Sequence, residues 1–139
     1  MVGPGALAPV TVTVPAGLRQ APFDVPRRLS VPAGWSAAVY ARIPGARFLA
    51  YAGGGSEDLL VSQPSTGSVQ LVRRQADGSA RVTPWLTGLN GPHDIVPAGS
   101  WVYVAERTRV VRYPWTRGAP TPGPGRVVVA GLPTGGHEL

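Results

Sequence analysis

Glycine and proline occur along the whole chain, with 19 Gly and 16 Pro among 139 residues. Proline removes a helix donor and glycine raises the entropic cost of ordering, so this distribution excludes long helices. The longest run without either residue is Ser100 to Tyr113. It contains Trp101-Val102-Tyr103-Val104, a sequence of strong β-formers. The sequence therefore predicts an all-β protein.

Short apolar runs bounded by turn residues recur along the chain. We expect strands at Ala37–Arg42, Arg47–Tyr51, Asp58–Ser62, Ser68–Arg73, Arg81–Trp85, Trp101–Ala105, Arg109–Tyr113 and Arg126–Ala130. Asp77-Gly78 is a two-residue hairpin signal between two of these strands. Strands spaced by about 8–12 residues are typical of sandwiches, barrels and propellers.

An internal repeat distinguishes among these three architectures. Gly88-Leu89 is echoed by Gly131-Leu132, and Leu60-Val61-Ser62 is echoed by Tyr103-Val104-Ala105. Both steps are 43 residues long, within the range of about 40–45 residues for a four-stranded propeller blade. We therefore predict a partial β-propeller, with about two four-stranded blades plus the start of a third.

A propeller blade buries both faces of its sheet against neighbouring blades, and propellers close with about 4–8 of them. We therefore expect residues 27–139 to be the N-terminal blades of a larger propeller that is truncated at the C-terminus. Residues 1–26 contain five prolines and little periodicity. They predict a Pro/Gly-rich N-terminal arm.

The charge, the apolar stretches and the cysteine content of the chain limit the classes of partner and site that we expect. The formal net charge of +6 comes from scattered arginines that form no basic stripe, so we expect no nucleic-acid binding. No apolar stretch approaches the roughly 20 residues of a membrane span. Met1–Val14 lacks a positive start and is interrupted by Pro4 and Pro9, which makes it a poor secretory signal. With no cysteine, the chain has no disulfides or thiolate metal sites.

Several short segments of the sequence, taken in order, resemble the glucose/sorbosone dehydrogenase family. They are Leu29–Trp35, Val39-Tyr40-Ala41, Gly45–Ala50, Leu59–Ser62, Thr66–Val69, Gly88-Leu89 with Pro92-His93, Tyr103–Glu106, and Gly131-Leu132-Pro133 leading to His137. The resemblance runs from about Phe23 to the end of the chain and reaches only the N-terminal third of the family.

The resemblance implies a six-bladed propeller that holds pyrroloquinoline quinone at its axis. It also implies a sugar or aldehyde substrate, oxidised by passing two electrons to the quinone, a further electron acceptor, and a periplasmic or secreted location. Calcium is possible, but its ligands and the basic residues that grip the cofactor would lie in later blades. The chain would thus be the N-terminal part of a quinone-dependent dehydrogenase, and we expect it to be inactive alone.

Two site residues follow from the resemblance. His137 matches the family's catalytic histidine by position, and its ordinary pKa near 6.5 suits a base near neutral pH. Its alternative is a solvated loop residue. Asp58 lies where the family places a polar side chain near the cofactor, and its alternative is a turn-forming acid beside Glu57.

His93, Asp94 and the four tryptophans are the remaining residues to which a site role could be assigned. His93 and Asp94 are adjacent and would point to opposite faces of a strand, so we interpret His93 as a packing residue that hydrogen-bonds the backbone. The four tryptophans are predicted packing anchors, with sugar stacking as the alternative for one of them. A non-catalytic binding propeller and a lactonase-like hydrolytic propeller with a central divalent metal remain alternative functions, because fold alone does not choose.

Overall fold

The computed structural model describes residues 6–134 and confirms the all-β prediction. The chain divides into two compact units between Arg42 and Ile43. The first unit contains a two-stranded antiparallel sheet of β1 (Leu7–Thr11) and β2 (Arg28–Pro32), with a 3-10 helix at Ala16–Leu18. β1 thus lies within the range for which the sequence predicts an arm. Pro9 is tolerated in it because both strands of a two-stranded sheet are edge strands.

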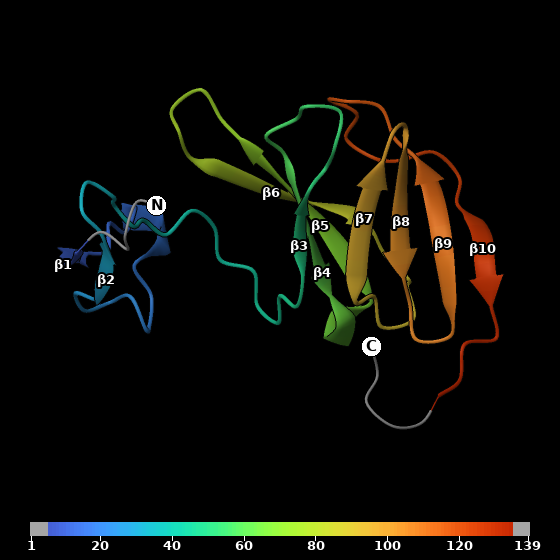
Figure 1. The fold of residues 1–139 in the computed structure, drawn as a ribbon, viewed down its shortest axis with the longest axis horizontal. Coiled ribbons are helices and arrows are strands. Elements are labelled where there is room, and N and C mark those ends of the chain that lie inside the picture. The colour runs from blue at the N-terminus through green and yellow to red at the C-terminus, as the bar shows by residue number, and fades with distance from the viewer. Residues whose placement is uncertain (1–5, 135–139) are drawn as a thin grey trace. The chain divides into compact units, whose positions relative to one another are not determined.

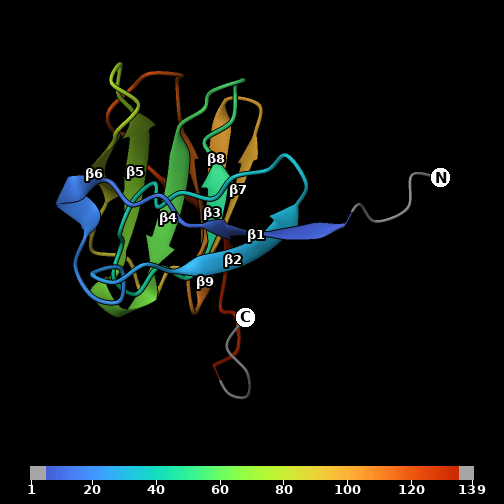
Figure 2. The same ribbon diagram turned by 90° about the vertical axis from the view of Figure 1, so that its left-hand side faces the viewer.

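The second unit contains two four-stranded antiparallel sheets, each of which follows the order of the sequence. The first sheet consists of β3 (Leu49–Tyr51), β4 (Leu59–Gln63), β5 (Ser68–Arg74) and β6 (Ala80–Leu86). The second sheet consists of β7 (Asp94–Ala98), β8 (Trp101–Ala105), β9 (Arg109–Pro114) and β10 (Arg126–Ala130). Their first strands, β3 and β7, lie side by side (Figures 1 and 2).

The strand predicted at Ala37–Arg42 is wrong. The structure has only an isolated parallel bridge between Thr13 and Ala38 there. Thr13 donates to Ala37 O at 2.9 Å and accepts from the Val39 amide at 2.9 Å. The next bond of a parallel ladder would need the amide hydrogen of residue 15, which is Pro15 and has none. The ladder therefore stops after one residue.

β7 has no counterpart among the predicted strands because Pro97 interrupts its apolar run. In the structure β7 is the edge strand of the second sheet, and Pro97 pairs with Val102. An edge strand tolerates proline because one of its sides needs no amide donor. The hairpin predicted around Asp77-Gly78 is confirmed, but the connection between β5 and β6 has five residues, 75–79, and not two.

The core of the second unit lies between its two sheets. Leu60, Leu71 and Trp85 of the first sheet share one buried cluster with Ile95, Val102, Val104, Val111 and Tyr113 of the second sheet. Trp85 meets Tyr113 edge to face, with ring centroids 6.3 Å apart. Such aromatic pairs add about 0.5–1.5 kcal/mol beyond the area that they bury.

The tryptophan prediction is only partly right. Trp85 and Trp115 are buried in the core cluster and act as packing anchors. Trp101 is half-buried, with the guanidinium of Arg112 4.2 Å from its ring centroid. Trp35 is 69% exposed, so the prediction is wrong for this residue.

The two sheets are stacked in the same orientation, so that the core-facing side of one sheet corresponds to the outer side of the other. Leu60 points into the core, and Tyr103, 43 residues later, points to the outer face of the second sheet. Conversely, Val104 points into the core, whereas Val61 belongs to the other face of the first sheet, because successive side chains of a strand alternate. Equivalent residues therefore do not meet across the core. The second sheet is stacked on the first as a repeated layer.

Candidate functional site

The connections of the second unit gather at two opposite ends of its sheets (Figure 1). Residues 52–58, 75–79, 99–100 and 115–125 form what we call the Asp58 end. Residues 64–67, 87–93, 106–108 and 131–134 form the Glu106 end. Strands of five residues separate the two ends by about 17 Å.

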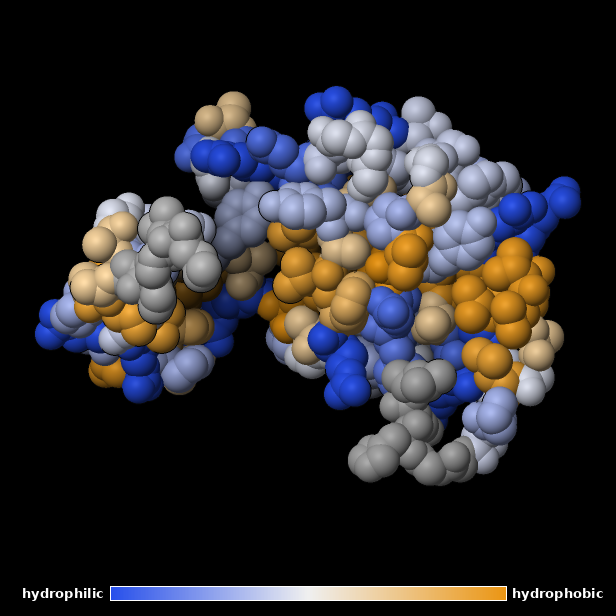
Figure 3. Space-filling view, in the orientation of Figure 1, coloured by the Kyte–Doolittle hydropathy of each residue, from blue (hydrophilic) through white to orange (hydrophobic). Residues whose placement is uncertain are grey.

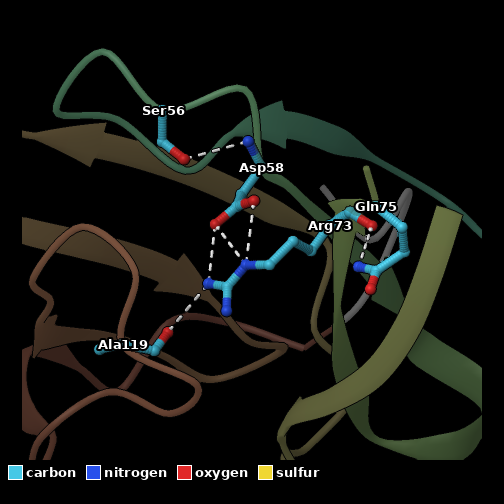
Figure 4. Close-up of polar contacts among 5 residues, drawn as sticks. All are labelled: Ser56, Asp58, Arg73, Gln75 and Ala119. Carbon is cyan, nitrogen blue, oxygen red and sulfur yellow. Dashed lines mark hydrogen bonds and ion pairs between the residues drawn. The ribbon is translucent and has the colours of Figure 1, made fainter. Parts of the chain in front are cut away.

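Asp58 is held by an arginine of the neighbouring strand (Figure 4). Arg73 Nη2 donates to Asp58 Oδ2 at 2.8 Å, and Arg73 Nε lies 3.1 and 3.2 Å from the two carboxylate oxygens. The Asp58 amide donates to Ser56 Oγ at 3.0 Å, which fixes the loop before β4. The hydrogen bonds to Asp58 raise the pKa of Arg73. Both carboxylate oxygens of Asp58 are therefore already engaged.

A shallow cleft of about 370 Å³ opens beside this ion pair. Arg73, Arg74 and Arg117 line it together with Glu57 and Asp58, so guanidinium groups outnumber carboxylates by one. Arg73 Nη2 also lies 3.5 Å from the carbonyl oxygen of Ala119, in the connection between β9 and β10. The pair of Asp58 and Arg73 therefore joins the two sheets at this end.

The Glu106 end holds a buried carboxylate that the sequence did not single out. Glu106 is 3% exposed, and its Oε2 accepts from the Asn90 amide at 2.6 Å. Arg109 Nε donates to Glu106 Oε1 at 2.8 Å and Arg109 Nη2 donates to Oε2 at 3.2 Å. The bonds and charge of Glu106 raise the pKa of Arg109. Glu106 thus holds the connection from β6 to β7 against the turn from β8 to β9.

Gln63 occupies the equivalent place in the first sheet, 43 residues before Glu106. Gln63 is 7% exposed, and its Nε2 donates to Pro44 O at 2.5 Å. Its Oε1 accepts from Gln70 Nε2 at 2.8 Å and from Ser68 Oγ at 3.2 Å. Each sheet therefore buries a hydrogen-bonded polar side chain at this equivalent position. The 43-residue spacing relates the two positions, but it does not predict that their side chains are buried.

His93 binds the backbone at the same end. Its amide donates to Ala105 O at 2.9 Å, and its carbonyl accepts from Ser62 Oγ at 2.8 Å. Ser62 is fully buried and Asp94 is exposed at the start of β7. These contacts make His93 a link between β4, β7 and β8.

His137 lies outside the described residues. The segment that leads to it begins at the Glu106 end, where the Leu132 amide donates to Thr108 O at 3.0 Å. Asp58 lies at the other end of the sheets. Of the two predicted site residues, the structure describes Asp58 alone.

Residues 6–134 contain neither a metal-binding cluster nor a membrane-spanning helix. No group of three or more His, Asp or Glu side chains within residues 6–134 is arranged to hold a metal ion. None of the helices in that range is long and apolar enough to cross a membrane. No protein-family model, curated protein or solved structure matches the chain.

Proposed function

We propose that the two sheets of the second unit are neighbouring blades of a β-propeller. The observation that carries this proposal is their stacking in the same sense, with Leu60 buried between the sheets and its equivalent Tyr103 on the outer face. A sandwich related by a two-fold axis would instead place equivalent residues opposite one another. Both sheets also follow the sequence order, and their first strands lie together, as expected around a central axis.

We further propose that this propeller belongs to a quinone-dependent dehydrogenase of sugars or aldehydes. The resemblance to the glucose/sorbosone dehydrogenase family supports this reaction. Its matching segments fall on β2, β4, β8, the starts of β3 and β5 and the connections at the Glu106 end, and one of them, Val39-Tyr40-Ala41, falls on no named strand. In this proposal His137, as a neutral imidazole, accepts the proton of a substrate hydroxyl. Pyrroloquinoline quinone, when bound, would accept the electrons of the substrate.

The carboxylate of Asp58 is already bound by Arg73. Both carboxylate oxygens of Asp58 accept hydrogen bonds from Arg73, so neither oxygen is free to contact the cofactor. We therefore propose a structural role for Asp58, which joins β4 to β5 and orients Arg73. The cofactor contact predicted for Asp58 does not enter this proposal.

The test is dye-linked oxidation of aldoses and aldehydes by the protein translated from the complete reading frame. We expect a rate that depends on added pyrroloquinoline quinone, and a fall of about 10²–10⁴-fold in His137→Gln. His93→Gln is the matched control, because His93 serves packing in this account. A folded protein without quinone-dependent oxidation would contradict the proposal, and metal-dependent hydrolysis of lactones would favour the lactonase-like alternative.

A further inference from the structure

A second groove opens at the Asp58 end, between the first sheet and the connection from β9 to β10. We call it the Arg81 groove. It has a volume of about 330 Å³, and its polar lining consists of Arg73, Gln75, Arg81, Thr83 and Thr121. Among the described residues, no Asp or Glu side chain lines it. Figure 3 shows hydrophilic side chains gathered over the β5–β6 hairpin and the neighbouring connections at this end. The lining of the groove is therefore positively charged.

The two arginines of the groove lie directly opposite each other on β5 and β6. Like charges in such a cross-strand pair destabilise a sheet. Asp58 offsets this for Arg73 alone, by accepting bonds from its Nε and Nη2. The third guanidinium nitrogen of Arg73, Nη1, takes part in none of the contacts drawn in Figure 4. Arg81 is exposed and makes no ion pair or hydrogen bond with any other residue in the described range. The pair therefore retains both an uncompensated charge and donors without acceptors.

The arginine pair belongs to the first sheet and not to the repeat. The register of the first sheet places Asp58 opposite Arg73, and the register of the second sheet places Trp101 opposite Pro114 at the equivalent position. Neither Trp101 nor Pro114 is charged, so the second sheet forms its four-stranded ladder without a comparable cluster. β5 and β6 also lie on the far side of the first sheet from β3, the strand that the propeller proposal places at the central axis.

We propose that the Arg81 groove binds a small oxyanion, namely the carboxylate or phosphate group of a ligand, through Arg81 and Nη1 of Arg73. The planar guanidinium of Arg81 matches either group, because it donates two parallel hydrogen bonds. The hydroxyl groups of Thr83 and Thr121 line the same groove and supply further donors. The bound anion also neutralises the charge that Asp58 leaves uncompensated. This site lies away from the proposed axis and is independent of the dehydrogenase activity.

Nuclear magnetic resonance titration of the isotope-labelled chain measures this binding. Sodium phosphate and sodium acetate are added in separate arms, with sodium chloride at equal ionic strength as the reference. We expect saturable shifts of the Thr83 and Thr121 amide signals in at least one arm and none with chloride. Tighter binding of acetate would identify a carboxylate ligand, and tighter binding of phosphate would identify a phosphorylated one.

Two charge-matched variants separate a built site from a general effect of net charge. Arg81→Gln should weaken binding of the preferred anion by about fivefold or more, because it removes a charged pair of donors. Arg126→Gln removes the same charge from an exposed position on β10 outside the groove, so it should change the affinity by less than about twofold in salt. Amide signals that stay in place elsewhere show that each variant is folded. Equal losses in the two variants, or the absence of saturable shifts in both arms, would overturn the proposal.

Discussion

Leu60→Ala should be strongly destabilising because Leu60 is fully buried between two rigid sheets. Removing a buried leucine side chain costs its transfer free energy and leaves a cavity, together about 2–5 kcal/mol. Leu60 neighbours Ala50 and Leu71 across the strands, and the packed second sheet leaves little room for collapse. We expect about 3 kcal/mol or more.

Leu49→Ala is the matched control, because Leu49 lies on the adjacent strand but points to the other face. It is 61% exposed, so truncation removes less than half of the roughly 2 kcal/mol that full burial of a leucine contributes. We expect a loss below about 1 kcal/mol. The contrast between the two variants depends only on which face each residue occupies.

Thermal and urea unfolding followed by circular dichroism measure this contrast. For a unit of about 100 residues, each kcal/mol shifts the Tm by roughly 4–8 °C, so Leu60→Ala should unfold about 12 °C or more below the unmodified chain. Leu49→Ala should unfold within a few degrees of it, by the same estimate. Equal losses in the two variants would refute the assignment of Leu60 to the inter-sheet core.

Three further changes probe the Glu106 end and the core aromatic residues. Gly67→Ala should lower the free energy of unfolding, measured in urea, by about 1–3 kcal/mol. Gly67 has a φ of 61°, and an added Cβ would collide with Leu89 O. Gly78→Ala is the control and should cost less, because Gly78 has a φ of 82° but open space around it. Glu106→Gln should lower the free energy of unfolding by about 1–3 kcal/mol by removing charge-assisted bonds, and an unchanged urea midpoint would contradict this role. Burial raises the pKa of Tyr113, so stability should be full below pH 10 and fall as pH rises above it; Tyr113→Phe should abolish that fall.

Much of the fold was predictable because its strands are short apolar runs bounded by turn residues. Trp101–Ala105 and Arg126–Ala130 are strands with the predicted bounds. The strand β7 was harder to see, since Pro97 resembles a strand terminator until the position of β7 at a sheet edge is known. Conversely, Ala37–Arg42 has the composition of a strand but lacks a partner that can continue the ladder past Pro15.

The candidate site was less predictable because it depends on contacts between distant residues. Asp58 was singled out, but its ion pair with Arg73 spans β4 and β5 and is invisible in local sequence. Glu106 is joined to Asn90, 16 residues earlier, and only the burial of its side chain shows its importance. The repeat relates Glu106 to Gln63 by spacing, yet charge and composition give no reason to expect either to be buried.

The stacking of the two sheets in the same sense is most directly tested by nuclear Overhauser effects between methyl groups. Leu60 and Leu71 should give cross-peaks to the buried methyl groups of Ile95, Val102 and Val104, which share their core. Val61 should give none to Val104, its equivalent 43 residues later. Cross-peaks between Val61 and Val104, without those from Leu60, would mean that equivalent faces meet and would contradict the repeated-layer arrangement.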